Sequence, residues 1–180
     1  MKKRGSARAS GTRSGFTLVE MVITTAIIGI VSAISMVSLS AFRVKRDVES
    51  SARTFAAAIR EAQDFALTGK NISATAGNVP CEFRARTSGG VYYVEQADAA
   101  SGGACASYPA GGSGTRFLNG VTASATEVRF RIPRAEPLNV SGSELSSGSI
   151  DFVLTKGGVT GHVCVYPLGR VDERPIGSGC

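Results

Sequence analysis

The sequence predicts an α+β fold in which one long N-terminal helix packs on a small antiparallel β-sheet. Two observations carry this prediction. A helical pattern runs from about residue 17 to about residue 68, and residues 80–180 alternate short apolar strands with Gly-rich turns. With 180 residues, the chain is long enough for one domain with its own core and hardly long enough for two.

The first 15 residues form a basic segment. Without it, 15 Lys+Arg face 14 Asp+Glu, so the segment accounts for most of the net charge of +6. Basic residues ahead of an apolar segment stay on the cytoplasmic side of a membrane. The positive and negative charges of the rest of the chain nearly cancel, so its net charge does not indicate a nucleic-acid-binding surface. The five cations of the segment are Lys2, Lys3, Arg4, Arg8 and Arg13.

An apolar segment follows over residues 16–42, and Glu20 is its only charged residue. As a helix the segment would measure about 40 Å, enough to cross a hydrocarbon core of about 30 Å. A secretory signal peptide would be shorter and would end in a better small-residue site than Ser38-x-Ser40. A plain membrane anchor explains the length but not Glu20, because a carboxylate in lipid is costly.

Residues 15–20 read Gly-Phe-Thr-Leu-Val-Glu, and this motif resembles the cleavage and methylation signal of type IV prepilins. The resemblance implies that a prepilin peptidase cuts between Gly15 and Phe16 and then methylates the amino group of Phe16. Gly15 suits such a cut because a residue without a side chain lets backbone approach a protease. The resemblance gives Glu20 an assembly role. Its carboxylate lies about one helical turn from Phe16 and can pair with that ammonium, its own or a neighbour's.

The helical pattern continues over residues 43–69 with one apolar face and a charged remainder, and Gly69 is a plausible stop. We expect this amphipathic half to pack on the sheet. The stretch around Phe55 also resembles minor pilins and pseudopilins of the GspH/FimT type. Major pilins often have a mid-helix proline, whereas the first proline here is Pro80. The predicted apolar face consists of Val44, Val48, Ala52, Phe55, Ile59, Ala62 and Ala66.

Residues 70–180 are predicted to form an exported β-rich head. One hairpin is expected around Ser88-Gly89-Gly90, a strand over 126–133, and a second hairpin around Lys156-Gly157-Gly158. A Gly-rich loop separates the first hairpin from the strand, and residues 169–180 read as a tail. This order, a long helix followed by an antiparallel sheet, resembles the pilin architecture.

All four cysteines lie beyond the apolar segment, which favours two disulfides in an oxidising compartment. Three connectivities are open, and we expect the local pairs Cys81–Cys105 and Cys164–Cys180. Free buried thiols are the alternative. Since the chain has no CxxC motif and a single histidine, His162, we expect neither a metal site nor a cofactor.

No catalytic motif of the GxSxG, HExxH or GxxxxGK[ST] type occurs, so we expect no enzymatic activity. DNA contact is the remaining chemistry to weigh. DNA-binding pilins of the FimT type resemble one another in a glycine-arginine-any-arginine motif. The candidate here has Asp172 in place of the second arginine, with Glu173 next to it. Arg170 and Arg174 are therefore candidate phosphate contacts that the neighbouring acids disfavour.

The sequence thus predicts a non-enzymatic minor pilin or pseudopilin of a type IV pilus or a type II secretion pseudopilus. The alternative is a filament-displayed binding subunit for DNA uptake or adhesion. The expected partners are a prepilin peptidase, other pilin subunits through the N-terminal helix, the inner-membrane assembly platform and membrane lipid. We expect a single pass through the cytoplasmic membrane, with residues 1–15 inside and the head outside, before incorporation into a filament.

Overall fold

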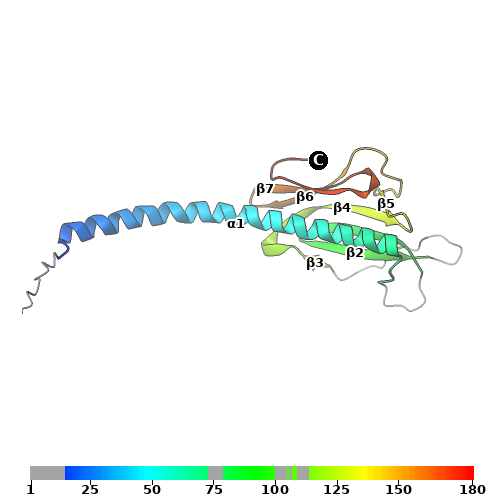
Figure 1. Cartoon of the computed structure of the whole chain (residues 1–180), viewed down its shortest axis with the longest axis horizontal. Helices are drawn as coiled ribbons and strands as arrows, with labels where there is room; N and C mark the ends of the chain where they lie inside the picture. The colour runs from blue at the N-terminus through cyan, green and yellow to red at the C-terminus, as the bar shows by residue number, and fades with distance from the viewer. Residues whose placement is uncertain (1–14, 73–78, 100–104, 106, 109–113) are drawn as a thin grey trace, which may run out of the picture. The chain divides into compact units, whose positions relative to one another are not determined.

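The computed structural model describes residues 15–72, 79–99, 105, 107–108 and 114–180 (Figure 1). Residues 1–14 of the predicted leader and most of the predicted Gly-rich loop lie outside this description. The chain divides into two compact units, Met1–Ser40 and Ala41–Cys180.

The helix α1 spans Leu18–Thr68, close to the limits that the sequence predicted. Its start is set by Thr17, whose carbonyl accepts a hydrogen bond from the Met21 amide at 3.2 Å. Its end is set by Gly69, which has a positive φ of 64°, a conformation that glycine adopts without steric cost. The Lys70 amide then donates to the Phe65 carbonyl at 3.3 Å, which closes the last turn.

Large apolar side chains of the first unit are exposed, among them Leu18, Val19, Ile23 and Ile28. No helix found among the described residues combines the length and the apolar character that crossing a membrane requires.

The head is an antiparallel sheet with the order β3-β2-β1-β4-β6-β7-β8, and β5 pairs with β4 (Figure 1). Both predicted hairpins are confirmed: β1 pairs with β2, and β6 pairs with β7 in a register that sets Phe152 opposite Val163. The strands are β1 Pro80–Gly89, β2 Val91–Asp98, β3 Thr115–Arg116, β4 Thr122–Arg131, β5 Glu136–Leu138, β6 Ile150–Lys156, β7 Val159–Val165 and β8 Val171–Arg174.

The core of the second unit lies between α1 and one face of the sheet. From the predicted apolar face of the helix, Val48, Phe55 and Ile59 are fully buried. The Phe55 ring packs edge-on against Phe152 of β6, with 4.9 Å between the ring centroids. Phe130 of β4 is also fully buried, so the predicted alternation of that strand is confirmed. Burying an aromatic side chain of this size contributes roughly 1.5–3 kcal/mol.

The predicted tail is wrong in one respect, because Val171–Arg174 forms the edge strand β8 on β7. Val171 reaches the core and is only 8% exposed, and this single apolar side chain commits the segment to the sheet. The Arg60 Nη2 on α1 donates a hydrogen bond to the Val171 carbonyl at 2.9 Å. That bond occupies a backbone group that an edge strand would otherwise leave unpaired.

Candidate functional site

The backbone around Gly15 and Phe16 is open. Residues 15–17 precede α1 without helix or strand, and all three are exposed. The Phe16 side chain is 79% exposed, and a Cβ added at Gly15 would meet no atom within 4 Å. A peptidase needs an accessible peptide bond without regular backbone hydrogen bonds, and this segment provides one directly before the helix.

Glu20 lies in the first turn of α1, three residues after Thr17. The Glu20 amide donates a hydrogen bond to the Thr17 Oγ1 at 3.3 Å. Thr-x-x-Glu is the sequence pattern of a capping box, in which a Thr side chain satisfies a free amide of the first turn. The Glu20 carboxylate also sits at the positive end of the helix dipole, where a negative charge is favoured. This local role was not predicted, although the spacing of Thr17 and Glu20 in the sequence indicates it.

Both disulfides have the pairing that the sequence favoured. Cys81–Cys105 joins β1 to the segment after β2, with 5.9 Å between the Cα atoms. Cys164–Cys180 joins β7 to the segment after β8, with 5.7 Å between the Cα atoms. In the chain-entropy model, a closed loop of this length stabilises the fold by about 3 kcal/mol.

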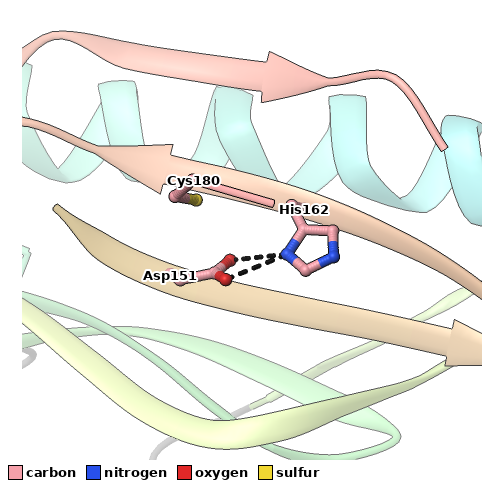
Figure 2. Close-up of side chains that lie close together, drawn as sticks. All are labelled: Asp151, His162 and Cys180. Atoms are coloured by element: carbon pink, nitrogen blue, oxygen red, sulfur yellow. Dashed lines mark hydrogen bonds and ion pairs between the residues drawn. The ribbon is translucent and has the colours of Figure 1, made fainter. Parts of the chain in front are cut away.

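His162, Asp151 and Cys180 place one ligand-type atom each within 4.8 Å of one another (Figure 2). The His162 Nδ1 lies 2.9 Å from both carboxylate oxygens of Asp151, as the dashed lines show. The sulfur of Cys180 is bound to Cys164, so it is not the thiolate that a metal ion requires. His162 and Asp151 alone are fewer than the three or four protein ligands of a zinc site. The arrangement is a His–Asp pair beside a disulfide.

The two arginines that the sequence singled out share one aromatic ring. The guanidinium of Arg170 lies 4.3 Å from the centroid of the Tyr166 ring, and that of Arg174 lies 5.8 Å from it. Arg174 Nη2 also donates to the Tyr166 hydroxyl at 2.6 Å, and this bond raises the pKa of the guanidinium. Both side chains therefore lie beside one ring on an exposed part of the head.

The acids next to these arginines have separate partners. Glu173 Oε1 lies 3.5 Å from Arg60 Nη1, and its Oε2 lies 3.9 Å from Arg53 Nε, so Glu173 is paired with α1. Asp172 Oδ2 lies 3.2 Å from Arg170 Nη2 and offsets that charge. Of the two acids that disfavoured DNA contact, only Asp172 pairs with one of the two arginines.

A second charged cluster covers β1, β2 and β4. Glu95 is 4% exposed and accepts hydrogen bonds from Arg84 Nε and from Arg86 Nε, both at 2.9 Å. Burial on its own would raise the pKa of Glu95, but the hydrogen bonds from Arg86 and Arg84 outweigh it and lower the pKa. Arg84 also pairs with Glu127 at 3.0 Å, and its guanidinium stacks 3.9 Å from the Tyr108 ring centroid. These ion pairs join neighbouring strands, so the cluster helps to hold the sheet together.

Residues 11–36 match the family model described as the prokaryotic N-terminal methylation motif. No curated protein and no solved structure gives a match to the chain. The matched stretch contains Gly15, Phe16 and Glu20. Such a motif indicates a structural subunit and implies processing by a prepilin peptidase and assembly with other pilins. Together with a fold of one helix on an antiparallel sheet, it supports a type IV pilin-like protein.

Proposed function

We propose that the chain is a minor pilin or pseudopilin of the GspH/FimT type, a building block of a type IV pilus or a type II secretion pseudopilus. The observation that carries the proposal is the methylation motif at residues 11–36, directly at the head of α1. In this proposal the prepilin peptidase cleaves after Gly15 and methylates the new amine of Phe16. The protein is a substrate of that enzyme and carries out no catalysis itself.

Cleavage would place a positive ammonium at Phe16, next to the positive end of the helix dipole. That arrangement is unfavourable unless a negative group lies close. Glu20 lies four residues away on the first turn, where it can neutralise the ammonium of its own chain or of a neighbour. In an apolar surrounding, each charge would be costly alone and tolerable as a pair. The pair would therefore fix the register of one subunit against the next.

The exposed apolar side chains of the first unit must be shielded from water by another molecule. Leu18 is 80% exposed, Ile28 64% and Ile30 64%, and such a concentration of exposed apolar surface marks an interaction site. We propose that membrane lipid covers residues 16–42 before assembly and that the helices of neighbouring subunits cover them in the filament. The chain would cross the cytoplasmic membrane once, with the head outside. The inner-membrane assembly platform would then take subunits from this membrane into the filament.

The test compares Glu20→Ala and Glu20→Gln with wild type in cells that assemble the filament. Loss of one partner of a desolvated ion pair costs about 3–5 kcal/mol, so incorporation into sheared filaments should fall by about 100-fold or more. Glu61→Gln is the matched control, because Glu61 is an exposed carboxylate of the same helix. Incorporation of both Glu20 variants at wild-type levels would refute the assembly role.

A second candidate is a filament-displayed DNA-uptake or adhesion subunit. It is favoured by the shared position of Arg170 and Arg174 on Tyr166 and by the pairing of Glu173 with α1. Asp172 still opposes phosphate contact. In a gel-shift assay with duplex DNA, Asp172→Asn should strengthen salt-sensitive binding, and Arg170→Gln with Arg174→Gln should abolish it. Absence of binding by wild type and Asp172→Asn alike would remove this candidate.

A further inference from the structure

Directly after the apolar segment, the helix carries three cations. They are Arg43, Lys45 and Arg46, and we call them the basic collar. All three are exposed. Among the residues that the structure describes, none of the three forms an ion pair or a side-chain hydrogen bond. Surface arginines and lysines elsewhere in the head mostly have partners, so the collar is unusual in presenting its charge.

None of the three collar residues is buried against the sheet. Successive residues of an α-helix are about 100° apart around its axis, so positions 43, 45 and 46 fall on different sides. Val44 and Val48 occupy the sheet-facing side between them. A Cβ at Gly157 would lie 3.4 Å from the Val44 Cγ1, and Val48 is fully buried. The three cations thus surround the part of the helix circumference that the sheet leaves open.

The nearest acid does not neutralise the collar. Asp47 Oδ2 accepts a hydrogen bond from Lys156 Nζ at 2.6 Å, and its Oδ1 accepts one from Asn119 Nδ2 at 3.0 Å. The Asp47 carboxylate is therefore committed to the sheet side of the helix. Its charge is balanced by Lys156. Glu49, the other acid within four residues of the collar, forms no ion pair with it among the described residues.

The position of these charges needs an explanation. Cations beside a membrane segment favour the cytoplasmic side, so three of them at the head end of residues 16–42 work against export of the head. Directly before the collar, Leu39 is 49% exposed and Phe42 59% exposed. An exposed apolar helix surface that changes within one turn to unpaired cations matches the boundary between acyl chains and phosphate groups in a bilayer.

We propose that the basic collar binds the phosphate groups of anionic phospholipids at the outer surface of the membrane. The proposal rests on the proposed function in one respect: it takes residues 16–42 to lie in that membrane before assembly. Arginine and lysine reach headgroup phosphates with their long side chains while the helix stays in place. The collar would then hold the unassembled subunit at a fixed depth in the membrane.

The experiment uses the absence of tryptophan from the chain. The full chain with Phe42→Trp is reconstituted into vesicles of phosphatidylcholine and phosphatidylglycerol. In one preparation the phosphatidylcholine is brominated, in the other the phosphatidylglycerol, and bromine quenches the tryptophan fluorescence. Quenching by each brominated lipid gives the relative occupancy of the site next to the collar. One cation near an anionic surface contributes about 1 kcal/mol, so phosphatidylglycerol should be preferred by at least about fivefold, and less at high salt.

Replacing all three collar residues by Gln in the Phe42→Trp background should bring the preference close to one. The control replaces Lys70, Arg116 and Arg134 by Gln, which removes the same charge from other exposed parts of the head, and it should keep the preference. Equal quenching by both lipids in the Phe42→Trp protein, or a preference that survives the loss of the collar, would overturn the proposal.

Two outcomes distinguish failure of the lipid proposal from failure of the proposed function. Quenching by both lipids without a preference refutes the collar alone and leaves the membrane segment standing. If neither brominated lipid quenches the introduced tryptophan, the membrane position of residues 16–42 fails, and the lipid assignment fails with it.

Discussion

Gly161 of β7 lies directly against Val48 of α1: a Cβ at position 161 would stand 2.8 Å from the Val48 Cγ1. The helix can approach the sheet this closely because position 161 has no side chain. Gly161→Ala should therefore lower the free energy of unfolding by about 1–3 kcal/mol, the usual cost of an overpacked core. Urea denaturation measures the change.

Gly90→Ala is the matched control, since a Cβ there would meet only the Val121 carbonyl at 3.8 Å. Combining Gly161→Ala with Val48→Ala should recover part of the loss, because the clash disappears while a small cavity remains. A Gly161→Ala protein as stable as wild type would show that α1 and the sheet are less tightly packed than this contact requires.

Glu95 and Arg84 form a buried pair, whereas Glu136 and Arg134 form an exposed one. Glu95→Gln should destabilise the head by about 3–5 kcal/mol, because it leaves two arginines partly buried beside a neutral group. Glu136→Gln should change stability by less than about 1 kcal/mol. Equal effects of the two substitutions in urea denaturation would show that burial does not set the cost.

Asp47 makes stability depend on pH. The hydrogen bond from Lys156, aided by that from Asn119, lowers the pKa of Asp47 below its usual value of 3.8. A carboxyl group whose folded pKa is lowered stabilises the fold above the unfolded pKa, and this contribution is lost as pH falls through the folded pKa. Asp47→Asn should therefore be less stable than wild type at pH 7, and the gap should close as the pH falls below the usual carboxyl range. Glu61→Gln serves as the control, because it removes an exposed carboxylate from the same helix.

Leu168 occupies a turn position that suits glycine. It has φ 66° and ψ 10°, is 95% exposed and follows Pro167 in the turn between β7 and β8. These angles are those of the third residue of a type II turn, where a side chain is disfavoured. Leu168→Gly should raise the free energy of unfolding by about 0.5–1 kcal/mol, whereas Leu168→Ala, which keeps the Cβ, should not. Thermal denaturation distinguishes the two variants, and a stabilising Leu168→Ala would contradict the explanation.

The repeating patterns of the sequence were enough to predict the long helix and the hairpins. Apolar residues at three- and four-residue spacing located α1, because a helix of that length repeats its pattern many times. The Lys156-Gly157-Gly158 turn located β6 and β7, because the register of a hairpin follows from its turn. The cysteines have the expected local pairing, one of the three connectivities that the sequence left open.

Other features depend on contacts that no local pattern reveals. The strands β3, β5 and β8 are two to four residues long, too short to show alternation, and β8 is held by Val171 and by Arg60 from α1. The burial of Glu95 was not predictable, because a charged residue in a strand is ordinarily exposed. Its environment forms only when β1 brings Arg84 and Arg86 beside β2. The shared ring of Arg170 and Arg174 likewise depends on the turn that carries Leu168.

We expect a prepilin peptidase to recognise the motif at residues 15–20. Mass spectrometry of the protein purified from cells with an active peptidase tests it most directly. The account predicts a chain that begins at Phe16 and carries one methyl group on its amine, and a full-length chain when the peptidase is inactive. A full-length chain in cells with the active peptidase, or a cut at any other bond, would contradict it.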